Sequence, residues 1–193
     1  MEYFDELFEA SYHQSLSDVQ KSTLKEKTEK SIKGIFCGID TSLPAKELIA
    51  KLEDRGSLYL VYEDPSLFSR DFPLMGKVNC VSYADFIVSA LDMMGRGDVA
   101  VDIRVKYDSE HLWLCYEKGS ENFEIDTANH RSDKSHTLRS LVAANLVNKG
   151  IMLAEMKNYD EAVAVALEAS KLDNDMEKAR ILLENVRILR RRM

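Results

Sequence analysis

Residues 79–94 read NCVSYADFIVSALDMM, and from Val81 onward they are nearly all apolar. The polar residues that interrupt this run recur at steps of three or four, at Ser82, Asp85, Ser89 and Asp92. That spacing predicts a helix that is buried except for one narrow polar stripe. Glycines at positions 95 and 97 follow the run and predict its end.

The segment after this helix has the alternation of a β-strand. Within 99–107, apolar residues at the odd positions alternate with polar or small residues, and a period of two is typical of a half-buried strand. Two further strands are expected at 110–117 and 122–126, with a turn at 117–120. We therefore expect an α+β core in which a meander of antiparallel strands packs on the buried helix.

The first third of the chain predicts helices and one loop. Residues 1–35 are polar and charged, which favours one or two surface helices. Residues 42–55 predict a helix that Ser42 caps and Gly56 stops. Residues 64–77 contain two prolines and a glycine, which favour a loop or short turns.

The C-terminal part is rich in Ala, Leu, Glu and Lys and predicts helices alone. We place a domain boundary near residue 135, which divides the chain into a core of 1–135 and an all-α segment of 136–193. Within 143–176 the regular spacing of small, aromatic and aliphatic residues resembles a tetratricopeptide repeat. The residues that carry this resemblance are Gly150, Tyr159, Ala162, Ala169 and Leu172.

The repeat-like segment is too short to bury its own faces. We therefore expect it to lean on the core as a brace, with Gly150 as the small residue that lets two helices approach. A third helix at 177–193 is expected to turn four apolar side chains inward, those of Ile181, Leu182, Val186 and Leu189.

Composition bounds the class of protein. The chain has 193 residues, a formal net charge of −7 and a pI of about 5.2, so it lacks the basic footprint of a nucleic-acid-binding protein. No apolar run reaches the ~18 residues of a membrane helix, and the acidic start lacks the pattern of a signal peptide. We expect a cytoplasmic protein with neither nucleic acid nor membrane as a partner.

The three cysteines, Cys37, Cys80 and Cys115, are widely spaced and include no Cys-x-x-Cys pair. This spacing fits a reducing compartment better than a disulfide framework. No convergent spacing of His, Cys and carboxylate residues indicates a metal site, and we expect no cofactor. A lone cysteine is usually a small buried hydrophobe, which is the starting interpretation of all three.

Cys80 opens the buried helix, where the positive end of the helix dipole favours a thiolate. His111 falls on the second expected strand and Asp126 at the end of the third. A cysteine, an imidazole and a carboxylate can act as nucleophile, base and orienting group in acyl transfer. A chain with four histidines and three cysteines offers several such combinations, so the residue types alone do not single this one out.

The local sequence around these residues is more specific. The block 79–86, the triplet His111-Leu112-Trp113 and the pair Asp126-Thr127 resemble the transglutaminase-like superfamily of papain-fold cysteine enzymes. The resemblance covers about residues 75–130 and implies a papain-like α+β core. It also implies Cys80 as nucleophile, His111 as base and Asp126 as orienter. Bacterial proteins that join such a core to tetratricopeptide helices exist as a group, so the two resemblances support each other.

Two neighbours of this triad are candidate substrate contacts. Asn79 precedes the nucleophile, and Trp113 shares a strand face with His111 because side chains two residues apart point the same way. Trp113 has the alternative role of core residue, and Cys115 on the same face is expected to be core. The remaining histidines are expected at the surface, with His130 as a substitute base; they are His13, His130 and His136.

The sequence thus leads to two hypotheses of different class. The first is a cysteine-dependent amide hydrolase or acyltransferase that works through a thioacyl intermediate on a protein or peptide substrate. The alternative is a catalytically inactive protein of this fold that binds a protein partner through its C-terminal helices. A further hypothesis makes residues 1–35 a regulatory flap over the cleft.

Overall fold

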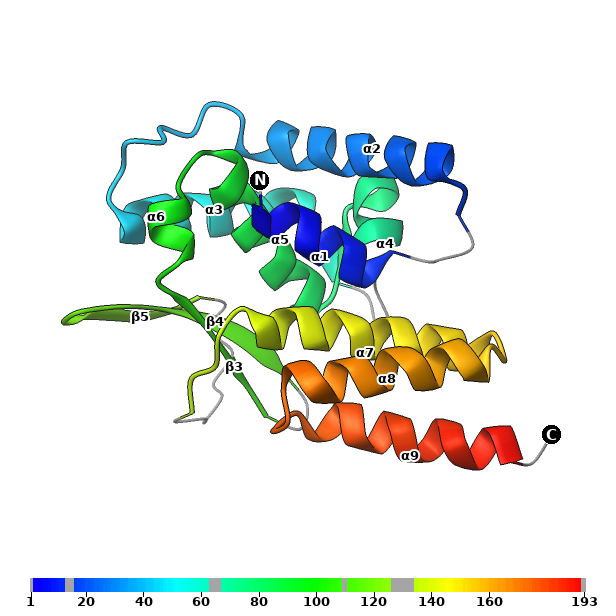
Figure 1. Cartoon of the computed structure of the whole chain (residues 1–193). Coiled ribbons are helices and arrows are strands. Elements are labelled where there is room, and N and C mark those ends of the chain that lie inside the picture. Colours follow the sequence, from blue (N-terminus) through cyan, green and yellow to red (C-terminus); the bar gives the residue numbers. More distant parts are fainter. Residues whose placement is uncertain (1, 13–15, 63–66, 109–110, 126–133, 192–193) are drawn as a thin grey trace.

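The structure, a computed structural model, describes residues 2–12, 16–62, 67–108, 111–125 and 134–191. Its architecture is mixed α+β, with helices predominating (Figure 1). The helices are α1 (Glu2–Ser11), α2 (Asp18–Phe36), α3 (Ala45–Tyr59), α4 (Phe68–Met75), α5 (Cys80–Met93), α6 (Gly97–Ala100), α7 (Arg139–Glu155), α8 (Tyr159–Leu172) and α9 (Glu177–Arg191). The strands are β1 (Val61–Tyr62), β2 (Lys77–Val78), β3 (Ile103–Tyr107), β4 (Leu112–Lys118) and β5 (Glu121–Ile125).

Helix α5 lies at the centre of the core, as the sequence predicted. Its expected polar stripe is covered as well, because α1 and α7 pack against it. Asp85 is fully buried and accepts a hydrogen bond from Asn145 Nδ2 of α7 at 2.8 Å. Asp92 accepts one from the backbone amide of Phe4 of α1 at 3.0 Å. Two polar residues of α5, Asp85 and Asp92, therefore join it to its neighbours.

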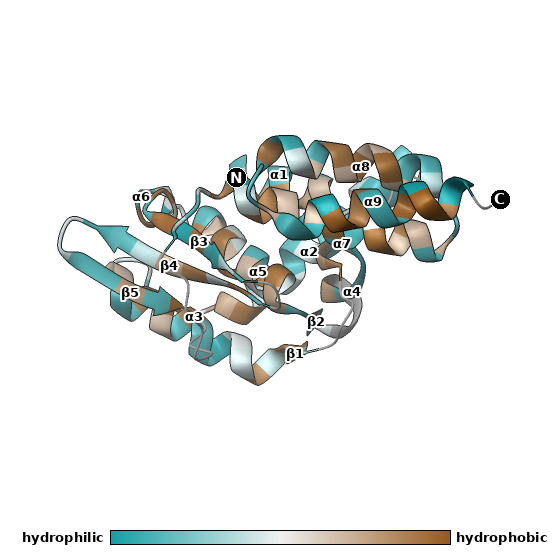
Figure 2. Cartoon of the chain, turned by 90° about the horizontal axis from the view of Figure 1, so that it is seen from below, coloured by the Kyte–Doolittle hydropathy of each residue, from teal (hydrophilic) through white to brown (hydrophobic). Residues whose placement is uncertain are grey.

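The predicted meander is confirmed as an antiparallel sheet of order β3-β4-β5, with Val105 opposite Leu114 and Leu114 opposite Ile125. The middle strand β4 is buried for most of its length, whereas β5 is largely exposed. In Figure 2, most of β5 has the colour of hydrophilic residues. The prediction of a strand from residue 99 is wrong for its first half. Val99 and Ala100 are buried in the short helix α6, whose amides bond back to the carbonyl of Arg96.

The predictions for the first third of the chain need three corrections. Helix α1 is not a surface helix, because Phe4 and Phe8 are fully buried. Helix α3 does not stop at Gly56 but continues past it. A Cβ atom at this position would lie 3.2 Å from the nearest ring atoms of α5. The hydroxyl of Ser42 does not cap α3 but donates to Asp40 Oδ1 at 2.8 Å.

The expected loop at 64–77 contains helix α4. Phe68 and Phe72 lie one turn apart on it and are both buried, so their burial outweighs the prolines of the segment. Gly76 ends the helix at a φ of 60°, and a Cβ there would lie 2.7 Å from the carbonyl oxygen of Tyr59. The short parallel pair of β1 and β2 follows directly after this close approach.

Helices α7, α8 and α9 run side by side as antiparallel neighbours, below α1 in Figure 1. The turn between α7 and α8 has Lys157 at a φ of 62°. On α9, Leu182 and Val186 are buried as predicted. The inward orientation predicted for Ile181 and Leu189 is wrong, because these side chains are 47% and 40% exposed.

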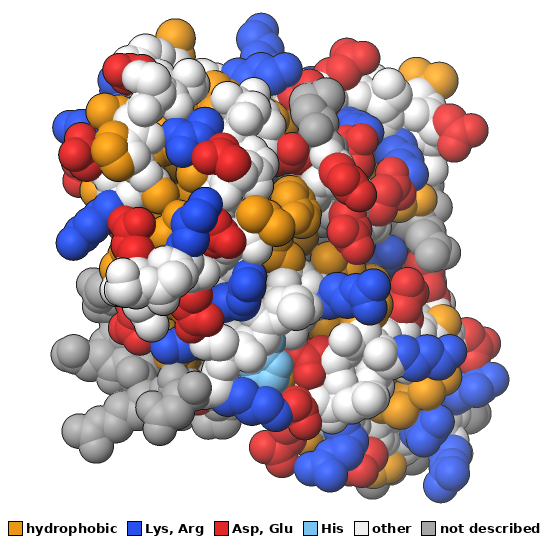
Figure 3. All heavy atoms as spheres, turned by 60° about the vertical axis from the view of Figure 1, so that its left-hand side comes forward, with side chains coloured by type: hydrophobic (Ala, Val, Ile, Leu, Met, Phe, Trp, Pro, Cys, Tyr) orange, Lys and Arg blue, Asp and Glu red, His pale blue; other side chains and the backbone are white. Residues whose placement is uncertain are grey.

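Buried side chains of residues 2–125 and of the C-terminal helices belong to one hydrophobic core. The C-terminal segment therefore leans on the rest of the chain, while the boundary near residue 135 stays a prediction. Within the described ranges, no helix combines the length and apolar character needed to cross a bilayer. On the face drawn in Figure 3, basic and acidic side chains are interspersed.

Gly150 of α7 is the position at which the three C-terminal helices meet. A Cβ there would lie 2.6 Å from Leu182 Cδ2 and 3.1 Å from Val165 Cγ2. We expect Gly150→Val to lower the free energy of unfolding by about 2 kcal/mol through overpacking, measured by denaturant unfolding. Gly34→Ala, at an exposed helical glycine with no atom near its Cβ, is expected to raise it by about 0.5–1 kcal/mol. Equal stability of Gly150→Val and the unsubstituted chain would contradict the packing described.

Burial raises the pKa of Asp85 well above its usual range, and the hydrogen bond from Asn145 opposes this only in part. Asp85 Oδ2 has no hydrogen-bond partner in the described part of the chain. In the folded state Asp85 therefore keeps its proton above about pH 4, where the same carboxyl in the unfolded chain loses it. Because the folded state then binds more protons than the unfolded state, the free energy of unfolding falls as pH rises.

We expect Asp85→Asn to remove this loss, so that its unfolding free energy relative to the unsubstituted chain increases from pH 4 to pH 7. The measurement is urea unfolding across that range. Asp98→Asn is the opposite control, because a hydrogen bond from Arg96 lowers the pKa of Asp98 and its stabilising effect grows with pH. Identical pH profiles of Asp85→Asn and the unsubstituted chain would refute the account of Asp85.

Candidate functional site

A cleft of about 600 Å³ lies between the core and the C-terminal helices. The core contributes the start of α5, the end of β3 and the start of β4, together with Tyr62 of β1. The opposite wall comes from α7 and from the start of α9. The lining includes Asn79, Cys80, Tyr107, Asp108, His111, Ile151, Asp175 and Ile181.

Cys80 is the first residue of α5 and is half-buried at the cleft wall. Asn79 fixes this helix start, because its side-chain oxygen accepts the amides of Val81 at 3.1 Å and Ser82 at 3.0 Å. In return, Ser82 Oγ accepts the amide of Asn79 at 2.8 Å, which completes a capping box. Cys80 is thus held at the positive end of a well-defined helix.

His111 lies just before β4 and lines the same cleft as Cys80. Two hydrogen bonds with Asp108 hold it there: its amide donates to Asp108 Oδ1 at 2.7 Å, and its carbonyl accepts the amide of Asp108 at 3.0 Å. The ring of Trp113 stacks beside the imidazole, with centroids 6.3 Å apart and planes 15° from parallel. Asp108 and Trp113 therefore set the position of His111.

The structure brings three of the five predicted site residues to one cleft, namely Asn79, Cys80 and His111. Trp113 is 1% exposed and lies behind His111, where it supports the imidazole. Asp126, the predicted orienter, lies outside the described residues, as does His130.

The other two cysteines differ from Cys80 in their surroundings. Cys37 is exposed, and Cys115 is fully buried in β4, as the sequence predicted for a core residue. Burial raises the pKa of the Cys115 thiol to about 11, and a hydrogen bond to Glu117 adds to the shift. Cys80 is the one cysteine that lines the cleft among the described residues.

Sequence reasoning missed the wall formed by the C-terminal helices. Ile151 and Ile181 line the cleft although neither belongs to the buried stripe of its helix. Tyr107 and Asp175 meet at the same end of the cleft from opposite parts of the chain. The sequence carries no local signal for this role of Ile151 and Ile181, because their exposure at the cleft is defined only once the helices are placed against the core.

The expectation that His136 is a surface residue is wrong. Its side chain is 10% exposed and its ring stacks on Tyr107, with centroids 4.5 Å apart. Backbone hydrogen bonds in both directions join it to Val105 of β3, at 2.8 and 2.9 Å. Asp173 accepts the Tyr107 hydroxyl at 2.9 Å, and burial together with this carboxylate raises the pKa of Tyr107.

The described cleft is chemically suited to thiol chemistry. A half-buried cysteine at a helix start and an imidazole share its wall, and the helix dipole favours the thiolate form of that cysteine. The rest of the lining is mostly aliphatic and aromatic, with carboxylates at Asp108, Asp175 and Glu177 and one cation at Lys178.

Comparison with known proteins gave no match, either to a protein-family model or to a curated protein.

The cap of α5 can be tested separately from any chemistry. We expect Asn79→Ala to lower the free energy of unfolding by about 1–2 kcal/mol, because two first-turn amides lose their acceptor. Asn158→Ala is the matched control, since Asn158 precedes α8 without capping it and is expected to change stability by less than about 0.5 kcal/mol. Chemical denaturation measures both. Equal effects of the two substitutions would contradict the capping role of Asn79.

Proposed function

We propose that this chain is a cysteine-dependent acyl-transfer enzyme, with Cys80 as nucleophile, His111 as base and Asp126 as the residue that orients the imidazole. The observation that supports this most is the shared cleft of Cys80 and His111, which come from separate elements. We extend the proposal to the fold: α5 and the sheet β3-β4-β5 are a papain-like core of transglutaminase type, and α7 and α8 are a tetratricopeptide-like pair.

The proposed reaction begins with transfer of the Cys80 thiol proton to His111. The sulfur attacks the carbonyl carbon of an amide, and the backbone amide of Cys80 stabilises the oxyanion. The carbon–nitrogen bond breaks as the leaving amine takes the proton from the imidazolium. An acyl group is then held on Cys80 as a thioester. Water or a second amine attacks the thioester and releases Cys80 for another cycle.

The substrate in this proposal is a protein or peptide. An apolar cleft of about 600 Å³ with walls from two parts of the chain has room for a side chain and its flanking backbone. Free cysteines at all three positions suit a reducing compartment, and we propose the cytoplasm as the location.

The alternative function is a binding module without catalysis. The wall of α7 and α9 supports it, because Ile151 and Ile181 offer exposed apolar contacts to a bound segment. In that case Cys80 and His111 are contact residues, and the thiol has no special reactivity. Thiol reactivity therefore discriminates between the two functions.

We expect iodoacetamide at pH 7 to alkylate Cys80 at least tenfold faster than Cys37, because an imidazole and a helix start favour the thiolate. Cys37 is an exposed thiol in the same molecule and serves as the internal reference. Buried Cys115 is expected to stay unlabelled. Peptide mapping by mass spectrometry measures all three rates together.

His111→Ala is expected to bring the rate of Cys80 down to about that of Cys37. His13→Ala is the control for loss of an imidazole far from Cys80 and His111 in sequence and is expected to leave the rate unchanged. Equal rates at Cys80 and Cys37, with no effect of His111→Ala, would refute the enzyme and favour the binding module.

A further inference from the structure

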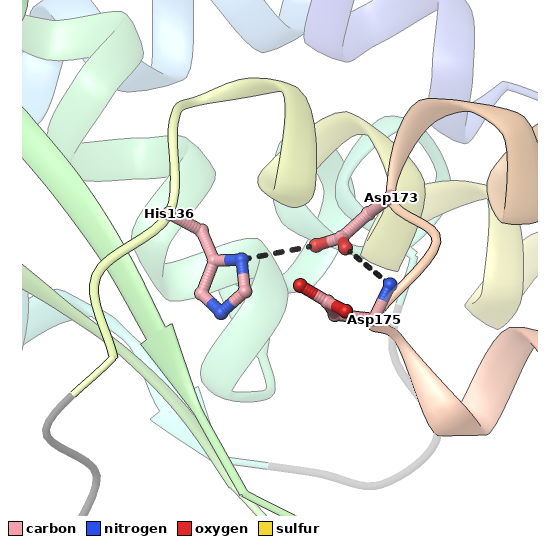
Figure 4. A group of neighbouring side chains, drawn as sticks. All are labelled: His136, Asp173 and Asp175. Atoms are coloured by element: carbon pink, nitrogen blue, oxygen red, sulfur yellow. Dashed lines mark hydrogen bonds and ion pairs between the residues drawn. The ribbon is translucent and has the colours of Figure 1, made fainter.

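A histidine and two aspartates meet at one end of the cleft, from segments far apart in sequence (Figure 4). His136 lies beside β3, whereas Asp173 and Asp175 belong to the turn between α8 and α9. One ligand atom from each side chain can be chosen so that all three lie within 4.8 Å of one another. We propose that these residues bind a divalent transition-metal ion, with Zn²⁺ as the best match to the donors.

The two most buried donors are already oriented by neighbouring groups. Asp173 accepts the Tyr107 hydroxyl on Oδ2 at 2.9 Å and the backbone amide of Asp175 on Oδ1 at 3.0 Å. The ring of His136 is fixed by stacking on Tyr107 and turns Nδ1 toward Asp173. Metal-binding carboxylates and imidazoles commonly have such outer partners, which hold their ligand atoms in place.

The spacing of these donors fits an ion better than a direct hydrogen bond. His136 Nδ1 lies 3.6 Å from Asp173 Oδ2, beyond the ~3.2 Å limit of a good hydrogen bond. Two ligands of a tetrahedral Zn²⁺, each about 2.1 Å from the metal, lie about 3.4 Å apart. A small shift of the exposed Asp175 side chain completes three ligands, and the cleft gives solvent access to a fourth position.

Charge also favours a cation here. Asp173 is 7% exposed, and a buried carboxylate is stabilised by a cation or a metal. Lys134 pairs with Asp175, but both side chains are more than half exposed, so a divalent ion can displace this pair. One imidazole and two carboxylates form a mixed nitrogen and oxygen set, which favours Zn²⁺ over Mg²⁺.

A bound ion would join the turn between α8 and α9 to the edge of β3. That joint lies next to the cleft, because Tyr107 and Asp175 both line it. The ion would therefore fix the wall of α9 relative to the core, independently of the chemistry at Cys80.

The test is isothermal titration of the full chain with ZnCl₂ at pH 7. We expect one high-affinity site that is weakened at least tenfold by His136→Ala and by Asp175→Asn. Asp175 is exposed, so its substitution keeps the test valid even where His136→Ala disturbs the fold. We also expect Zn²⁺ to raise the melting temperature of the unsubstituted chain but not that of Asp175→Asn.

Cys80→Ser and His111→Ala are the controls, because a cysteine and a histidine in the cleft are alternative zinc ligands. Both are expected to keep the site intact. Loss of binding in these two variants, with binding unchanged in Asp175→Asn, would overturn the proposal. Absence of Zn²⁺ binding below millimolar concentration, or equal affinity for Mg²⁺, would overturn it as well.

Discussion

The rest of the molecule depends on the hydrogen bonds between Asn79 and the first turn of α5. They determine where the most deeply buried helix begins and therefore where Cys80 lies. Helices α1 and α7 then pack on α5 and use its polar residues, as in the contact of Asn145 with Asp85. The helix cannot rotate or slip without burying these polar groups unpaired, which is costly. A rigid helix start at the cleft wall is the result.

The cleft depends equally on the C-terminal helices. Its core wall alone would be an open surface, and α7 and α9 turn that surface into a cavity. The close packing at Gly150 holds these helices together, and the single hydrophobic core holds them against the rest of the chain. The C-terminal segment is therefore a structural part of the site. It does more than brace the core from a distance.

Local patterns predicted much of this structure, and contacts between distant segments account for the rest. The polarity of 79–94, the alternation of the strands and the small residue at 150 are local signals, and all were informative. Helix α4 was not predicted, because the prolines of the segment favour a loop. The burial of two phenylalanines stabilises the helix, and this burial cannot be read from the sequence. The roles of Ile181 and His136 depend on neighbours from other elements, so neither residue carries a local signal.

In the proposed function, Cys80 is an activated thiol because it shares a cleft with His111 at the start of a helix. The ultraviolet absorbance of the thiolate, followed against pH in the intact chain and in Cys80→Ser, tests it most directly. We expect a thiolate that is already present at pH 7, titrates well below ~8.5 and disappears with Cys80→Ser. A Cys80 signal that appears only near pH 8.5 or above would contradict it.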